Sequence, residues 1–405
     1  MNNFKIAWRN LWRNKKRTLI TMAAVFVAVF LSTFMSSMQE GTYSKMIDNI
    51  VKFYSGYIQI FKPDYWDTKS INDIYKPDKQ LIREINSVPE VTYFVPRLES
   101  YSLISSGENT RGGALIGIDP VKENKLTDLS KWVKEGSYLK PGDDGILVAV
   151  NLAKHLNLQL GDTVILLSQG YHGSSAAGLF PVRGILKFPS PELNNYGAYI
   201  TLNNARNFFS APGMVTSLVL MVDDYSDVAR AKRHLVSKLD DKYRTMTWAE
   251  MQPDLVQMIQ ADRSGGVIMK AILYIVIGFG IFGTIVMMVS ERKRESGIMI
   301  AVGMQKYRLE KILFYETLLT GLIGVIAGFI LSIPIIGYFV FHPIPLPAEM
   351  SQVYEMFGIE PAMYFSMMPK VFVNQAITVF VITLLISVYP IFKTAKLNLV
   401  NAIRG

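Results

Sequence analysis

The sequence contains no cysteine and only four histidines. Without cysteine the chain has no disulfides, no thiol chemistry and no Cys-based metal sites, so a folded domain must depend on its own hydrophobic core. The histidines show neither H-x-x-x-H nor H-E-x-x-H spacing, which argues against a zinc site. They stand at His155, His172, His234 and His342.

Common catalytic motifs are also absent. The chain has no G-x-S-x-G nucleophile elbow. Its acidic pair Asp143–Asp144 lies in a Pro-Gly turn, where solvated carboxylates are far more common than a catalytic pair. No G-x-x-x-x-G-K-S/T loop occurs, so the chain lacks the usual means of cradling ATP phosphates. We therefore predict no catalytic residue, cofactor or metal ion here, and any use of ATP must come from a partner chain.

What the sequence has instead is four long apolar runs. They cover 18–38, 267–290, 310–340 and 371–392. Each reaches the roughly 20 residues that cross about 30 Å of hydrocarbon, so we predict four transmembrane helices. The first run is too long for a signal-peptide core and no clear A-x-A site follows it, so we expect it to stay uncleaved.

Basic residues predict the orientation of these helices. The net charge of +9 concentrates in 1–17, in 291–309 and in 393–405. Because Lys and Arg near span ends are retained in the cytoplasm, these segments and both termini should be cytoplasmic. Residues 39–266 and the 341–370 loop should then be periplasmic. No cluster of basic and aromatic residues suggests nucleic-acid binding.

Residues 1–17 precede the first span, and 4–17 have the spacing of an amphipathic helix. Such a helix lies in the membrane interface and contacts lipid headgroups. We interpret it as an elbow helix that leads into the first span; a charged anchor that only sets orientation is compatible with this. The apolar face comprises Phe4, Ala7, Trp8, Leu11 and Trp12, and the cationic face Lys5, Arg9, Arg13 and Lys16.

The 39–266 segment has mixed strand and helix patterns. The predicted fold class is therefore an α-helical membrane protein with four transmembrane helices and a large extracytoplasmic α/β domain between the first and second spans. We expect two subdomains, with 120–212 inserted into the flanking part, and helical stalks at 39–50 and 249–266. Predicted strands are 56–61, 91–106, 111–119, 215–224 and 243–248, and predicted helices are 78–88 and 227–239; 145–170 and 196–209 supply further strand–helix units.

The segment between the second and third spans carries a family resemblance. An apolar span ends in E-R-x-R-E-x-G-I, an A-x-G follows, and a Glu-bearing span rich in glycine comes next. This pattern resembles the FtsX-like permeases of ABC transporters, which include lipoprotein-releasing and macrolide-exporting permeases. The resemblance implies a coupling helix that docks on a separate ATPase; the alternative is a basic loop that only sets topology. The implied coupling residues are Glu291, Arg292, Arg294, Glu295, Gly297, Ile298, Ala301 and Gly303.

The third span has two further features. Gly321, Gly324 and Gly328 share one face, which lets helices approach closely, within this subunit or against a second one. Glu316 is a carboxylate at the inner end of the apolar run and a functional candidate by default. We favour a structural ion pair with the basic hinge over a substrate site.

Residues 145–165 are similar to the outer domain of lipoprotein-releasing permeases. In that branch a loop at about the position of 169–182 hooks a soluble lipoprotein carrier, and the alternative is an ordinary hairpin loop. The apolar candidates for this contact are Tyr171, Leu179, Phe180 and Pro181.

The resemblance implies a permease subunit in the bacterial inner membrane that transmits ATP-driven motion to its periplasmic domain and releases lipoproteins. Expected partners are ABC ATPase subunits, a second permease in a homo- or heterodimer, membrane lipids and a periplasmic lipoprotein carrier. Two alternatives stay open. One is a macrolide-export type permease that expels peptides or drugs, and the other is a non-transporting permease that controls cell-wall hydrolysis.

Overall fold

A computed structural model describes residues 3–13, 15–51, 55–188, 191–222, 227–239, 241–291, 293–347 and 362–395. The chain divides into two compact units. Unit 1 comprises 1–44, 258–345 and 362–405, and unit 2 comprises 45–257 and 346–361. The 396–405 part of the predicted tail and residues 348–361 of the predicted 341–370 loop lie outside the described residues.

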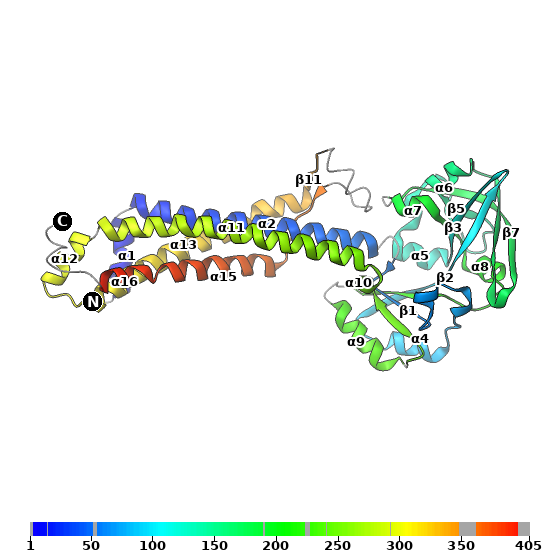
Figure 1. Cartoon of the computed structure of the whole chain (residues 1–405), viewed down its shortest axis with the longest axis horizontal. Helices are drawn as coiled ribbons and strands as arrows, with labels where there is room; N and C mark the ends of the chain where they lie inside the picture. Colours follow the sequence, from blue (N-terminus) through cyan, green and yellow to red (C-terminus); the bar gives the residue numbers. More distant parts are fainter. Residues whose placement is uncertain are drawn as a thin grey trace. The chain divides into compact units, whose positions relative to one another are not determined.

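Unit 1 is helical. Four helices are long and apolar enough to cross a membrane, at Thr18–Asn49, Pro253–Glu291, Lys306–Phe341 and Pro369–Phe392, which confirms the four predicted spans. Figure 1 shows these helices running alongside one another. The helices are α1 (Asn3–Arg13), α2 (Lys15–Ile50), α11 (Pro253–Glu291), α12 (Lys293–Ala301), α13 (Lys306–Phe341), α15 (Pro369–Ile386) and α16 (Tyr389–Ala395), and β11 (Ile344–Pro345) pairs with β12 (Ala362–Met363).

The predicted amphipathic helix is α1, and its apolar face divides in two. Ala7 and Leu11 are buried against Ile312 and Leu319 of α13. The aromatic members of the face stay about half exposed, with 49% for Phe4, 43% for Trp8 and 48% for Trp12. Ala7 and Leu11 therefore hold α1 against α13, while the three aromatic rings remain exposed for contact with the membrane interface.

Unit 2 is an α/β domain built on one ten-stranded sheet. Its order is β10-β1-β9-β2-β3-β8-β5-β7-β4, and β6 pairs with both β2 and β7. Each strand and helix predicted between 56 and 248 is present. The strands are β1 (Ile58–Phe61), β2 (Val91–Ser106), β3 (Asn109–Ile118), β4 (Val133–Gly136), β5 (Ile146–Ala149), β6 (Thr163–Gln169), β7 (Ser175–Leu186), β8 (Gly197–Thr201), β9 (Ser217–Val222) and β10 (Arg244–Thr247).

Short helices connect these strands. Asp78 caps α4 through its carboxylate, which accepts the Leu81 N–H at 2.7 Å, and Asp119 caps α5 in the same way through Val121. The helices are α3 (Tyr65–Thr68), α4 (Lys79–Asn86), α5 (Pro120–Thr127), α6 (Val150–His155), α7 (Pro191–Tyr196), α8 (Leu202–Phe208), α9 (Val228–Lys238) and α10 (Trp248–Met251), with 3₁₀ turns at Ile71–Asp73, Leu129–Trp132 and Tyr171–Gly173.

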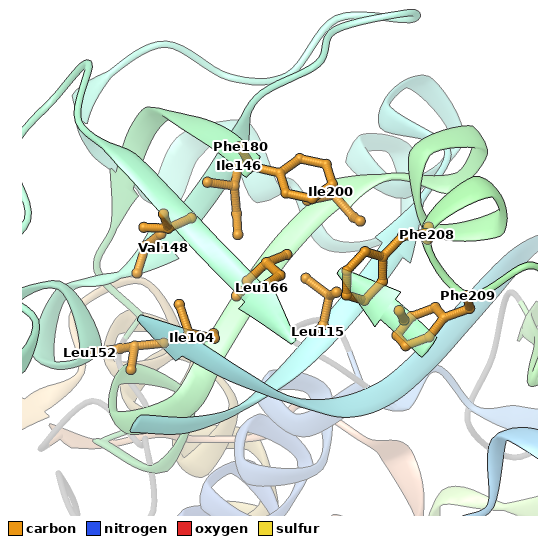
Figure 2. Close-up of a cluster of buried hydrophobic side chains, with 14 of the residues drawn as sticks. Ile104, Leu115, Ile146, Val148, Leu152, Leu166, Phe180, Ile200, Phe208 and Phe209 are labelled. Atoms are coloured by element: carbon orange, nitrogen blue, oxygen red, sulfur yellow. The ribbon is translucent and has the colours of Figure 1, made fainter. Parts of the chain in front are cut away.

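The pairings of β6 close part of the sheet into a barrel. Strands β2, β3, β8, β5, β7 and β6 pair in sequence, and β6 then pairs with β2 again. The interior is filled by apolar side chains, among them Ile104, Leu166 and Phe180 (Figure 2). We expected 120–212 to be a separate inserted subdomain, but the barrel also needs β2 and β3, which precede that insertion. The 16-residue β2 continues into the β1, β9 and β10 side, so one sheet joins both parts.

Candidate functional site

The predicted coupling helix is α12, which lies between the second and third spans. Its C-terminus forms a Schellman motif: the Gly303 N–H donates to the Ile300 carbonyl at 3.0 Å, and the Met304 N–H donates to the Met299 carbonyl at 3.0 Å. This geometry requires a left-handed residue, and Gly303 has φ +102°. The A-x-G of the sequence motif is therefore the end of a helix, where a residue without Cβ is favoured.

The outer surface of α12 combines charge with exposed apolar side chains. Arg294 and Glu295 are exposed, and the Glu295 carboxylate accepts a hydrogen bond from the Arg13 guanidinium of α1 at 2.8 Å. Ile298 is 49% exposed and Val302 is 83% exposed. The contact with Arg13 links α12 to α1, and the exposed apolar residues leave an unpartnered surface.

The predicted coupling residues are not all available for contact with a partner. Gly297 is buried together with its neighbour Ser296, so its role in the motif is packing inside unit 1. Arg292 lies outside the described residues. The remaining six are exposed: Glu291, Arg294, Glu295, Ile298, Ala301 and Gly303. Tyr307, at the start of α13, is a further exposed aromatic residue, at 64%, and was not singled out from the sequence.

Glu316 lies in α13, close to the coupling segment. It is 1% exposed, and its backbone carbonyl accepts a hydrogen bond from the Thr320 hydroxyl at 2.8 Å. Its neighbours in sequence, Ile312 and Leu319, pack on α1. Its burial is compatible with the structural role that we predicted. The predicted ion pair with the hinge stays a prediction.

The three glycines predicted to share one face of α13, Gly321, Gly324 and Gly328, lie against helices of the same chain. A Cβ added at Gly324 would be 2.8 Å from Val25 Cβ, and one at Gly328 would be 2.8 Å from Val29 Cβ. Both of these contacts are with α2. A Cβ added at Gly321 would lie 2.3 Å from Thr383 Cγ2 of α15. Of the two options that the sequence left open, the structure places this face within the subunit.

The predicted carrier-hook loop is largely strand. The 169–182 segment contains the end of β6, a 3₁₀ turn at Tyr171–Gly173 and the first half of β7. Phe180 is 8% exposed and points into the barrel in Figure 2, so it has no surface to offer a carrier. Tyr171 is partly buried and packs against the same core. The assignment of this segment to a loop was wrong because Ser, Ala and Gly, typical of loops, also occur in this strand. Contact with a carrier stays a prediction.

Leu179 alone among those candidates is strongly exposed, at 68%. The strand register shows what surrounds it: Leu179 pairs with Ile165 on β6, and Leu167 of β6 pairs with Leu103 of β2. Alternation places Leu103, Ile165, Leu167 and Leu179 together on the outer face of the barrel, and each is between 42% and 68% exposed. We call these four residues the outer apolar face. The unbroken apolar run V-I-L-L at 164–167 was a signal for it, since a strand with one solvated face normally alternates.

Three charged groups in unit 2 are held in low-dielectric surroundings, namely the pair Arg97–Glu123 and Lys69. Arg97 and Glu123 form a buried pair with Nη2 2.7 Å from Oε1, and their side chains are 2% and 1% exposed. Lys69 lies over the Trp66 ring with Nζ 3.2 Å from the centroid. Burial among aromatic rings lowers the pKa of Lys69 to about 8. Within the described ranges, no group of three or more His, Asp or Glu side chains suited to a metal ion occurs.

Two family models match this chain. The model of the MacB-like periplasmic core domain matches residues 18–238, more than half of the sequence, and the model of the FtsX-like permease C-terminal matches residues 267–399. The chain belongs to the FtsX-like permeases. The resemblance based on the coupling motif is thereby confirmed, as is the fold class of four spans with an α/β domain between the first two.

Curated relatives are permeases of ABC transporters. The chain is 24% identical over 335 residues to the lipoprotein-releasing system transmembrane protein LolC of Xylella fastidiosa, covering 78% of each chain. It is 21% identical over 265 residues to LolE of Haemophilus influenzae, covering 63% of each. It is 23% identical over 313 residues to the macrolide export protein MacB of Aggregatibacter actinomycetemcomitans, covering 73% of this chain and 47% of that one. The FtsX-like permease described here is therefore an ABC transporter permease of the LolC, LolE and MacB type.

The matched part spans between 60% and 78% of the length of the first two LolC relatives. Among solved structures, the extracellular domain of the transporter YknZ from Gram-positive bacteria matches 47% of this chain with 16% identity and a TM-score of 0.33. The periplasmic region of MacB from Actinobacillus actinomycetemcomitans matches 53% with 15% identity and a TM-score of 0.36.

Proposed function

We propose that this permease docks a separate ABC ATPase on α12 and uses its ATP hydrolysis to release lipoproteins from the bacterial inner membrane. ATP and Mg would be bound by the ATPase. Both termini and α12 would be cytoplasmic, and unit 2 periplasmic, as the basic flanks indicate. A second permease subunit, identical or different, would complete the membrane part, since four helices are too few to enclose a pathway.

The observation that carries the coupling step is the exposed surface of α12. Ile298 and Val302 are one helical turn apart, and isolated apolar side chains of this exposure on a charged helix suit burial by a partner. The Schellman motif at Gly303 and the hydrogen bond from Arg13 to Glu295 hold the helix in place. A force applied to α12 would then pass to α1, and to α2 and α13, the spans that follow α1 and α12 in the chain.

Charge insertion on α12 tests this step. Val302→Glu would place a carboxylate in the buried centre of the interface and should weaken binding of the ATPase about tenfold or more, which corresponds to roughly 1.4 kcal/mol. Val121→Glu is the matched control, because Val121 is 65% exposed on α5 of unit 2. The readouts are co-purification of the ATPase encoded beside this gene and ATP turnover of the complex. Equal behaviour of the two variants would contradict docking on α12.

The lipoprotein substrate rests on two supports. Relatives that match along 60% or more of this chain carry the name of lipoprotein-releasing proteins. The outer apolar face presents four aliphatic side chains that suit a hydrophobic cargo or its carrier, and it replaces the hook loop as the candidate contact. Leu167→Asp should slow the appearance of lipoproteins in the soluble fraction of membrane vesicles supplied with carrier and ATP. Val236→Asp, at a 54% exposed position on α9, should not.

Efflux of peptides or drugs is the second candidate, favoured by the match to the MacB-like periplasmic core domain over 18–238. The two functions differ in phenotype. Depletion of the permease should leave outer-membrane lipoproteins in the inner membrane with unchanged macrolide sensitivity if release is the function. The opposite result would establish efflux.

A further inference from the structure

A pocket of about 320 Å³ lies inside unit 1, between α2, α11 and the start of α15. All three walls are at the same end of the helical bundle, where the apolar run of α11 begins. Gly266 shapes one side, because a Cβ there would lie 2.1 Å from Nε2 of Gln39. The lining residues are Ser36, Gln39, Glu40 and Tyr43 of α2, Arg263, Val267 and Lys270 of α11, and Met368, Lys370, Val371, Asn374 and Gln375 at the start of α15.

The pocket has an excess of positive charge. Three cations, Arg263, Lys270 and Lys370, face one carboxylate, that of Glu40. Arg263 already pairs with it, with Nη2 3.2 Å from Oε2, and also lies over the Tyr43 ring at 5.1 Å. Among the residues that the structure describes, neither Lys270 nor Lys370 forms an ion pair. The two lysines therefore have no ion-pair partner of their own among the described residues, although the Glu40 carboxylate also attracts Lys270 and the Asp262 carboxylate accepts a hydrogen bond from Tyr43 at the pocket wall.

Each of these lysines is in an unfavourable place when considered alone. Lys270 is the only charged residue in the apolar run 267–290, and it lies one turn inside that run. Lys370 is the second residue of α15, an 18-residue helix whose positive dipole end repels a cation. An anion held between the two side chains would neutralise the charge of Lys270 in the apolar run and offset the repulsion of Lys370 by the helix dipole.

The depth of the pocket indicates which anion this is. A lysine one turn inside an apolar run carries its ammonium group at the level of lipid headgroups. The other lining residues match a phospholipid headgroup and its glycerol end: the amides of Asn374 and Gln375 can donate to phosphate oxygens, and the apolar surfaces of Val267 and Met368 lie beside them. Lysines bind phosphate as point charges.

We propose that this pocket binds the phosphate-bearing headgroup of a membrane phospholipid, held between Lys270 and Lys370. The site goes beyond the proposed transport activity and does not depend on it. The bound lipid would bridge three spanning segments of one subunit, at the end where α2 and α11 enter the bundle. If Lys270 only extended its side chain toward the headgroup region without binding a particular lipid, Lys370 would not be involved. Substitution of Lys370 therefore distinguishes the two explanations.

The full-length permease purified in a neutral detergent is the material for the test. Native mass spectrometry would measure retention of added phosphatidylglycerol by wild-type protein, Lys270→Gln, Lys370→Gln and the double variant. Lys122→Gln is the control, since Lys122 is an exposed cation on α5 and its loss changes the net charge equally. We expect each pocket variant to weaken phosphatidylglycerol binding about tenfold, the factor that corresponds to roughly 1.4 kcal/mol, and Lys122→Gln to have no effect. Lys270→Arg should restore most of the binding.

Four results would overturn the proposal. Equal retention by Lys270→Gln and wild type would remove Lys270 from the site, and equal retention by Lys370→Gln would reduce it to snorkelling. Equal binding of diacylglycerol, which has no phosphate, would show recognition of acyl chains only. Displacement of phosphatidylglycerol by millimolar inorganic phosphate would indicate a site for free phosphate instead of a lipid. A circular-dichroism thermal scan of each variant distinguishes loss of binding from loss of folding.

Discussion

The contact of α13 with α2 offers a sharp test of how the bundle is held together. A Cβ at Gly324 would be 2.8 Å from Val25 Cβ and 2.9 Å from the Met22 carbonyl oxygen. Ordinary carbon contacts are about 3.5–4.0 Å, so Gly324→Ala must separate the helices by roughly 0.7 Å or strain them locally. Because the second atom belongs to the backbone of α2, rotation of a side chain cannot relieve the contact. Overpacking of this kind costs about 1–3 kcal/mol.

The same helix supplies the control. A Cβ at Gly337 meets no atom within 4 Å. Gly337→Ala should be neutral or slightly stabilising, since alanine is favoured over glycine in a helix by about 1 kcal/mol. Unfolding in mixed micelles of neutral detergent and SDS, followed by circular dichroism, measures the difference as a shift of midpoint. If Gly324→Ala and Gly337→Ala unfold at the same SDS fraction, close approach of α2 and α13 is not what these glycines provide.

Three further predictions concern single residues outside that contact. Gly303→Ala should cost about 1–2 kcal/mol by forcing an L-residue into the left-handed region, and should lower the ATP turnover of the complex, whereas Gly280→Ala, at an open helical position, should not. Arg97→Ala should lower the free energy of unfolding of unit 2 in urea by about 3–5 kcal/mol because it leaves a buried carboxylate unpaired, while Arg183→Ala, in an exposed pair, should change it far less. The pKa of Lys69 is about 8 in the folded state against the usual 10.5 of a lysine, so the unfolded state binds more protons between these values and stability should rise with pH there. Lys69→Met should abolish that rise, and an unchanged slope in urea titrations between pH 8 and 10.5 would contradict the assignment.

Much of this architecture follows from local patterns. Apolar runs of membrane length predicted the four spans, because hydrocarbon thickness sets a minimum helix length that few other sequences meet. Alternation and turn residues predicted the strands of unit 2 from 56 to 248. The A-x-G at the end of α12 is also a local signal, because the Schellman motif involves only the last turn of a helix and the residues directly after it.

Long-range pairing was what local patterns did not reveal. β6 pairs with β2, about sixty residues earlier in the chain, and this pairing closes the barrel and decides which face of β7 is inside. Phe180 and Leu179 are neighbours with similar hydrophobicity, yet one is 8% exposed and the other 68%. A shift of register by one residue would exchange them, so nothing short of the strand pairing could assign them. The inclusion of Phe180 among the exposed candidates was wrong for this reason.

For the glycine face of α13, the sequence predicted close contact but not the partner. The spacing of Gly321, Gly324 and Gly328 predicted close helix contact correctly, since small residues on one face permit backbones to approach. The partner was undetermined because the spacing is identical for contact within a subunit and between two. In the structure the face is divided, with Gly321 against α15 and the other two against α2. This face is therefore occupied by the chain's own helices, and a second permease subunit would have to use other surfaces of the bundle. The exposed apolar residues of α11, from Val267 to Phe279, are the candidates for such a contact.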